Sequence, residues 1–248
     1  MLPYINIFNL QISTYLLLHI LAFVINIFLL KYLSLIKYFN FFKYYILYIV
    51  LILSSFLFSR VIGEIFYNSN INLISILKNP NGETSYLGVI SIIPVIVYLF
   101  SKFHNQSFLH VLSIFIPLIL LFQTLGKIGC LLAGCCYGAE TNCFLNIEVN
   151  SSIDHYNTLT NVHPVQIYES IIYLTGFIIY FIKHNDWKDV ELVSFYFMYY
   201  GFIRFFMVFL RGDIVYSGIL FFTNSQLYSI LIFSFGLLLH LFKYKNSG

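Results

Sequence analysis

The sequence predicts an all-α, polytopic membrane protein, and three observations carry this prediction. Hydrophobic residues make up 60% of the 248 residues and charged residues only 9%, and the mean hydropathy is +0.85. A soluble domain carries about 25% charged residues. The apolar residues also fall into runs of about 20, the length that an α-helix needs to cross a bilayer. We therefore expect a single integral membrane domain over residues 1–248.

Seven apolar runs have this length and predict seven transmembrane helices. A signal peptide has a shorter apolar core that follows its basic residues. The first run is as long as a full span and precedes its lysine, Lys31, so we expect a helix there. The runs lie at roughly 12–31, 44–62, 86–102, 109–127, 165–183, 191–210 and 226–243.

The basic residues predict the orientation of these helices. Cytoplasmic loops carry an excess of lysine and arginine. Eight lysines fall on one side, at Lys31, Lys37, Lys43, Lys102, Lys183, Lys188, Lys243 and Lys245, and three basic residues on the other, at Lys78, Lys127 and Arg211. We therefore expect the N-terminus outside and the C-terminus in the cytoplasm. The formal charge of +3 is too small to suggest nucleic acid as a partner.

The segment 126–141 connects an apolar run to the longest polar loop, 128–164. It reads G-K-I-G-C-L-L-A-G-C-C-Y-G-A-E-T and holds four glycines and three of the four cysteines. Glycine is unfavourable inside a helix, so this density indicates close backbone approach to another helix or a ligand. Lys127 would lie near the edge of the hydrocarbon, where a positive charge needs a function. We interpret the segment as the floor of a site for a lipid headgroup.

Arginines within the apolar spans are the next candidates. Tyr200, Arg204 and Arg211 lie near one stripe of a 3.6-residue period. Guanidinium groups bind phosphate through a bidentate fork, so this stripe suits a phosphate at headgroup depth. Arg204 has no acidic residue within one turn, whereas Arg60 and Glu64 are four residues apart and form either an ion pair or part of a site. Arg211 has a simpler alternative, which is snorkelling from a helix end.

The fifth span begins with H-P-V-Q-I-Y-E at 163–169. Proline is favoured in the first turn of a helix, which places His163 at the helix N-terminus on the outer side. Gln166 and Glu169 lie one turn apart and project together. These groups either bind a substrate or orient other polar groups, and for Glu169 the favoured role is partner of a buried arginine.

The four cysteines leave three interpretations open. Cys130, Cys135, Cys136 and Cys143 lack C-x-x-C or histidine spacing, which argues against zinc or iron–sulfur. A nucleophilic thiol would need a lowered pKa, which Lys127 could provide. A disulfide is compatible with an outer loop, although adjacent cysteines join only with strain. The simplest interpretation is that cysteine packs as a small residue among the glycines.

Three segments resemble the prolipoprotein diacylglyceryl transferases, which are bacterial inner-membrane enzymes. Residues 126–141 resemble the family signature G-R-I-G-N-F-x-N-G-E-x-x-G-x-x-T, residues 163–169 resemble H-P-x-Q-L-Y-E, and Y-G-F-I-R-F-F at 200–206 resembles Y-G-x-x-R-F-x-x-E-x-x-R. The similarity runs from Tyr15 to Gln226. The positions that agree are Gly129, Gly134, Gly138, His163, Gln166, Tyr168, Glu169, Tyr200, Gly201, Arg204 and Arg211.

The departures from the family pattern concern polar residues. Lys127 replaces an arginine, Cys130 and Ala133 replace asparagines, Cys135 replaces a glutamate, and Val208 replaces an acid. The segment G-E-T-S-Y-L-G-V at 82–89 resembles G-x-S-F-H-G-G, with Leu87 at the position of a functional histidine.

The resemblance implies transfer of a diacylglyceryl group from phosphatidylglycerol to the cysteine thiol of a lipoprotein precursor, without a metal or other cofactor. It implies catalytic roles for Arg204, Tyr200, Lys127 and His163. It implies substrate binding by Lys127, Arg204, Arg211, Gly129, Gly134, Gly138, Gln166, Glu169 and Tyr15. Two alternatives are another lipid or acyl transferase with Cys135 or Cys136 as nucleophile, and a non-catalytic lipid-binding or transport protein.

Overall fold

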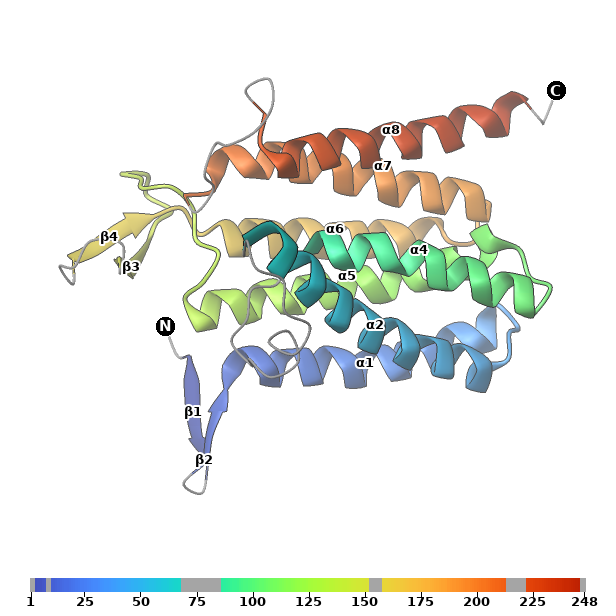
Figure 1. The fold of residues 1–248 in the computed structure, drawn as a ribbon, viewed down its shortest axis with the longest axis horizontal. Coiled ribbons are helices and arrows are strands. Elements are labelled where there is room, and N and C mark those ends of the chain that lie inside the picture. The colour runs from blue at the N-terminus through green and yellow to red at the C-terminus, as the bar shows by residue number, and fades with distance from the viewer. Residues whose placement is uncertain (1–2, 8–9, 68–85, 152–157, 213–221, 246–248) are drawn as a thin grey trace. The chain divides into compact units, whose positions relative to one another are not determined.

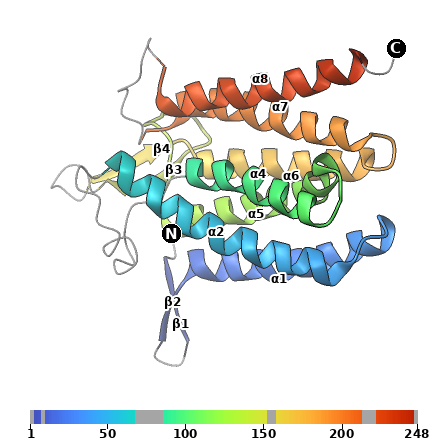
Figure 2. The same ribbon diagram turned by 45° about the vertical axis from the view of Figure 1, so that its right-hand side comes forward.

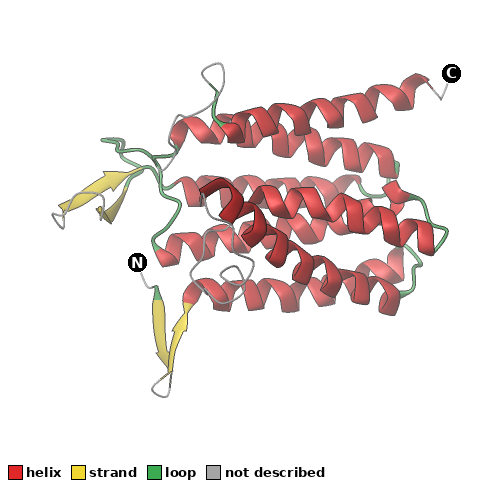
Figure 3. Ribbon diagram, viewed as in Figure 1, coloured by secondary structure: helices red, strands yellow, loops and turns green. Residues whose placement is uncertain are grey.

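Helices dominate the computed structural model, which describes residues 3–7, 10–67, 86–151, 158–212 and 222–245 (Figures 1 and 3). Each predicted span corresponds to a helix. Six of the helices found among the described residues are long and apolar enough to cross a membrane, and the third span is a shorter apolar helix, Gly88–Phe103 within α4. The helices are α1 Thr14–Ile36, α2 Phe41–Tyr67, α4 Tyr86–Phe103, α5 Phe108–Ala133, α6 Val165–Lys183, α7 Asp189–Met207 and α8 Asn224–Lys245.

The lipid environment explains why these sequences form helices. A helix satisfies its backbone hydrogen bonds internally, and no water is present in the hydrocarbon to replace them. Proline is tolerated in such helices because neighbouring helices can satisfy the backbone groups that it leaves without a hydrogen bond. Pro94 and Pro117 both lie inside helices. Large apolar side chains such as Phe28 and Leu35 are exposed on α1, as expected for a surface that faces lipid. The chain is therefore a multi-pass membrane protein.

The described residues form two compact units, residues 27–114 and a second unit of residues 1–26 with 115–248. In the first unit α2 packs closely on α4. A Cβ added to Gly88 would lie 2.3 Å from the carbonyl oxygen of Phe58, so only glycine fits this crossing. Arg60 and Glu64 are both buried on α2, one turn apart, and their mutual pairing stays a prediction.

The second unit contains residues 14–26 of α1, residues 115–133 of α5, and the helices α6, α7 and α8. Figures 1 and 2 show α7 and α8 side by side. Two glycines allow this approach: a Cβ on Gly201 would lie 2.7 Å from the Phe233 nitrogen, and one on Gly236 would lie 2.8 Å from the Met198 nitrogen.

Polar side chains join the other helices of this unit through backbone carbonyls. Asn26 of α1 donates from Nδ2 to Leu118 O of α5 at 3.0 Å. Ser170 of α6 donates to Thr124 O of α5 at 3.2 Å. Each bond satisfies a group that would be costly to bury alone.

Two β-hairpins, which the sequence analysis did not predict, flank the helices of this unit (Figure 3). Strand β1, Tyr4–Ile7, pairs antiparallel with β2, Leu10–Ser13, directly before α1. Strand β3, Ile147–Ser151, pairs antiparallel with β4, Thr158–Val162, before α6. Part of the expected polar loop 128–164 is therefore a strand pair.

Some predicted features lie outside the described residues. These are Lys78, the part of the 82–89 segment that precedes Tyr86, and the side chain of Leu87. The observed end of one helix also corrects an expectation. Helix α5 continues to Ala133, so Lys127 lies inside the helix and not at its end.

Candidate functional site

An ion-pair cluster of Lys127, Glu169 and Arg204 lies at the centre of the candidate site and joins three helices. Arg204 Nη1 of α7 donates to Glu169 Oε1 of α6 at 2.9 Å. Lys127 Nζ of α5 forms an ion pair with Glu169 Oε2. The expectation that Glu169 neutralises a buried arginine is confirmed. Arg204 has no acidic residue within one turn of its own helix, and its partner comes from another helix, so the arginine is not an unpaired cation.

The carboxylate lies behind the two cations. The Glu169 side chain is 0% exposed, whereas the side chains of Lys127 and Arg204 are 16% and 18% exposed. Two positive charges and one negative charge leave these three side chains with a net positive charge. The accessible side of the cluster is therefore cationic and suits an anion.

A stack of tyrosines lies near Arg204, and two of them, Tyr200 and Tyr173, interact electrostatically with it. Tyr200, one turn earlier on α7, is buried and stacks against Tyr173 of α6 and Tyr196 of α7, with ring centroids 6.4 Å and 6.1 Å away. Tyr173 was missed by the sequence analysis. The available signal was its position one turn after Glu169 on the same helix face.

Arg211 reaches the same region by a different route from the one predicted. Helix α7 ends at Met207 and is followed by a 3₁₀ turn, Val208–Leu210, after which Arg211 is extended with φ −86° and ψ 135°. The expected helical stripe through Arg211 is therefore wrong. Arg211 nevertheless interacts electrostatically with Glu169 and Arg204.

Three backbone segments meet beside Arg211. Gly138 N–H donates to His163 O at 2.9 Å, and Ala139 N–H donates to Leu210 O at 2.8 Å. Gly138 also forms an isolated bridge with Arg211. A Cβ on Gly138 would lie 2.6 Å from His163 Cβ. The close backbone approach expected at this glycine is therefore observed, and the neighbour is another segment of the chain.

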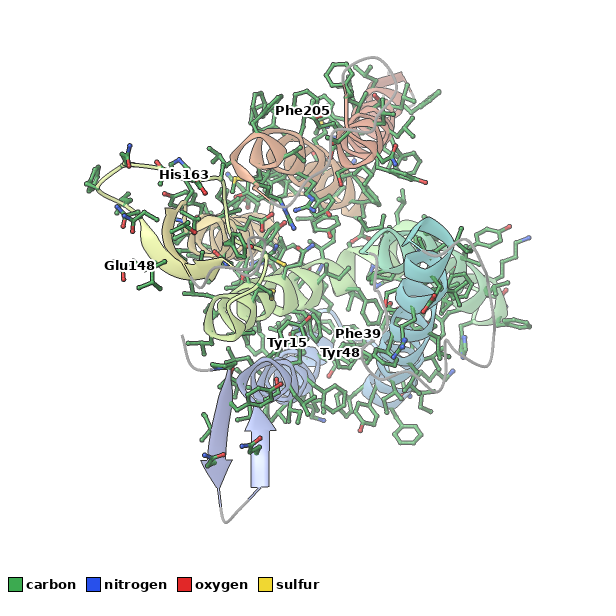
Figure 4. The ribbon with its side chains drawn as sticks, turned by 60° about the vertical axis from the view of Figure 1, so that its left-hand side comes forward. Tyr15, Phe39, Tyr48, Glu148, His163 and Phe205 are labelled. Carbon is green, nitrogen blue, oxygen red and sulfur yellow. The ribbon has the colours of Figure 1, made fainter. Side chains whose placement is uncertain are left out.

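His163 and Gln166 lie at the start of α6, as predicted. Figure 4 labels His163 at this end of the second unit. His163 Nδ1 is buried and has no hydrogen-bond partner among the described residues. Gln166 is fully buried and donates from Nε2 to Cys135 O at 2.7 Å. Gln166 therefore fixes the loop that follows α5.

Tyr15 and Gly129 form a second contact between α1 and α5. A Cβ on Gly129 would lie 3.3 Å from Tyr15 Cδ2, and Tyr15 in turn packs on His19 with ring centroids 4.1 Å apart. Gly134, directly after α5, has φ +76°, a conformation that glycine adopts readily. Gly129 and Gly134 thus have structural roles, and their binding roles stay predictions.

Three cysteines gather at the end of α5. The sulfur atoms of Cys130, Cys135 and Cys136 all lie within 4.8 Å of one another, and the cysteines are free. Hydrogen bonds from Cys130 and Cys135 hold the pKa of the Cys136 thiol well below its usual range, and the positive charge of Lys127 adds to this effect. The Cys136 thiol therefore lies within the electrostatic influence of the ion-pair cluster.

Comparison with known proteins gives a consistent set of relatives. A family model described as prolipoprotein diacylglyceryl transferase matches residues 3–242. The phosphatidylglycerol–prolipoprotein diacylglyceryl transferase of Clostridium tetani is 33% identical over 151 residues, 58% of this chain and 60% of the relative. That of Finegoldia magna is 32% identical over 185 residues, 73% of this chain and 68% of the relative. The alignment with the Clostridium tetani protein thus spans less than two thirds of that relative.

Proposed function

The chain belongs to the prolipoprotein diacylglyceryl transferase family, and we propose that it transfers a diacylglyceryl group from phosphatidylglycerol to the cysteine thiol of a lipoprotein precursor. The relatives carry names that describe this activity. The cationic cluster on α5 and α7 supports it from the structure, because phosphatidylglycerol presents a phosphodiester at headgroup depth.

The geometry of Arg204 carries the proposal. Its Nη1 donates to Glu169, and within the part of the chain that the structure describes this is the hydrogen bond recorded for its side chain. A guanidinium has five donors in a rigid fork, so the remaining donors can bind phosphate oxygens. Glu169 fixes the orientation of the fork from behind, and Lys127 supplies a second positive charge on the accessible side.

The reaction needs these cations at the leaving group. The sulfur of the acceptor cysteine attacks the glyceryl carbon next to the phosphate, a carbon–sulfur bond forms and the carbon–oxygen bond breaks. Glycerol phosphate leaves with the bonding electrons, and Arg204, Lys127 and Arg211 stabilise its growing charge. The thiol proton passes to a base.

Three residues are candidates for this base. Glu169 fits the role poorly because both of its oxygens face cations and the side chain is fully buried. Tyr200 is buried within the tyrosine stack. His163 fits better, because its buried Nδ1 has no partner among the described residues and an imidazole nitrogen can accept a proton.

The membrane placement follows the same proposal. We infer one membrane domain in the bacterial inner membrane, with the N-terminus outside and the C-terminus in the cytoplasm, from the distribution of lysine and arginine. The lipid would enter sideways between helices, and the precursor peptide would approach from the outer face.

Variants of Arg204 test the function. In membranes that contain phosphatidylglycerol and a precursor peptide, Arg204→Ala should lower the transfer rate by about 10²- to 10³-fold, the usual cost of losing one donor to a developing charge. Arg204→Lys keeps the charge but loses the fork and should fall between wild type and alanine. Lys183→Ala, at an exposed and weakly paired position, is the matched control and should transfer normally.

The fold should survive Arg204→Ala because Lys127 still pairs with Glu169. If folded Arg204→Ala transfers lipid at the wild-type rate, the phosphate site is elsewhere. A covalent lipid adduct on Cys135 or Cys136 would instead support a transferase that uses its own thiol as nucleophile. Failure of the wild-type chain to transfer any lipid would favour a binding or transport protein.

A further inference from the structure

The thiols of Cys130, Cys135 and Cys136 converge although their sequence spacing does not match a known metal motif. Cys130 is in the last turn of α5, and the other two follow the helix. Their three sulfur atoms lie within 4.8 Å of one another, and no disulfide joins them. Cys143, the fourth cysteine, is not part of this group.

The backbone after α5 is folded to bring the sulfurs together. Gly134 and Cys136 have φ values of +76° and +58°, so the chain reverses sharply after the helix. Cys135 N–H donates to Cys130 O at 3.0 Å, which closes this turn, and Gln166 Nε2 holds the Cys135 carbonyl from α6. A positive φ is uncommon for a residue other than glycine and persists only where neighbouring contacts enforce it.

We propose that Cys130, Cys135 and Cys136 form a binding site for one soft, thiophilic cation, either Cu⁺ or Zn²⁺. Metal–sulfur bonds are about 2.3 Å long, so three sulfurs around one ion are at most about 4 Å apart. The observed separations need only a small contraction to reach this geometry. The proposal does not rest on the transfer reaction.

The two ions complete their coordination differently. Three thiolates suffice for Cu⁺, a soft ion that accepts a thiolate-only shell, whereas Zn²⁺ takes a fourth ligand such as water to become tetrahedral. In either case each coordinated thiol releases its proton to the solvent, and no electron is transferred. The thiolates outnumber the charge of the ion, and the positive charges of Lys127 and Arg211, which both act on Cys136, offset the excess.

Metal titration of the full-length protein tests the site. The purified, reduced chain in detergent is titrated with Co²⁺ as a coloured substitute for Zn²⁺, then with Zn²⁺, and separately with Cu⁺ against a chromophoric chelator. We expect one ion per chain and thiolate-to-cobalt charge-transfer absorption. Cys130→Ser and Cys136→Ser should each weaken binding at least tenfold, whereas Cys143→Ser is the matched control and should bind like wild type.

A protection experiment keeps the test valid if a serine variant does not fold. In the wild-type chain the bound ion should slow alkylation of Cys130, Cys135 and Cys136, but not of Cys143, as measured by mass spectrometry of peptides. Saturable binding of Zn²⁺ but not Cu⁺, or the reverse, identifies the ion. The proposal is overturned if the reduced chain binds neither ion at one equivalent, or if Cys143 is protected equally.

Discussion

The carboxylate of Glu169 should contribute more to the free energy of unfolding than the carboxylate of an exposed acid does. A double-mutant cycle can measure this contribution. Glu169→Gln removes the negative charge between Lys127 and Arg204. The amide keeps one acceptor oxygen, so it can satisfy one cation while its NH₂ group faces the other. Removing one partner of a buried ion pair typically costs 3–5 kcal/mol.

The magnitude for this site lies near the lower end of that range. Both cations are partly accessible, at 16% and 18% exposure, so solvent recovers some of the lost interaction. We expect Glu169→Gln to lower the free energy of unfolding by about 3 kcal/mol. Lys127→Met removes one of the two positive charges. The double variant should therefore lose about 1–3 kcal/mol less free energy of unfolding than the sum of the losses in the two single variants.

Equilibrium unfolding in detergent is the assay, with the fluorescence of Trp187, the single tryptophan, as the signal. Asp186→Asn is the matched control. Asp186 lies 3.9 Å from Lys183 in an exposed pair, so its loss should cost less than about 1 kcal/mol. Two results would refute the reasoning: a Glu169→Gln effect as small as that control, or single effects that add within about 0.5 kcal/mol.

Two further predictions concern the backbone and the membrane topology. Gly138→Ala should destabilise the protein by about 1–3 kcal/mol, because its Cβ would lie 2.6 Å from His163 Cβ. Gly126→Ala, where the nearest atom is 3.5 Å away, should be neutral or stabilising by about 0.5–1 kcal/mol in the same unfolding assay. A reporter fused after Gly248 should be active only if it works in the cytoplasm, and activity of a periplasm-dependent reporter there would contradict the lysine-based orientation.

The helices were predictable because burial in lipid is a property of single segments. Each membrane-spanning helix needs about 20 apolar residues whatever helices surround it, so an apolar run of this length is enough to predict the helix. The β3–β4 hairpin was not predictable in this way: the alternation of apolar and polar residues in β3, I-E-V-N at 147–150, covers only four residues, and β4, T-L-T-N-V, does not repeat it. The end of α5 was misplaced by six residues because Lys127 was read as a boundary, whereas Glu169 allows the charge to lie inside the helix.

The sequence predicted what a single buried residue requires, but not which residue of another helix provides it. A buried acid such as Glu169 needs a cation, and the sequence analysis therefore expected an arginine partner. Which cation it meets depends on how helices pack, so the pairing with both Lys127 and Arg204 required the structure. The position of Arg211 was mispredicted because the 3.6-residue period was extended past Met207, where α7 ends.

The departures from the family pattern acquire a physical interpretation from these contacts. Val208 is fully buried in the turn after α7, where a carboxylate would need its own cation, and Arg204 already has Glu169. Cys130 and Cys135 replace an asparagine and a glutamate of the resembling signature, and both meet Cys136. The changes thus leave the guanidinium and its carboxylate in place, while the adjoining turn carries thiols where the family signature has an amide and a carboxylate. The proposed phosphate site and the proposed thiolate site therefore lie next to each other in this unit, and Lys127 and Arg211 contribute positive charge to both.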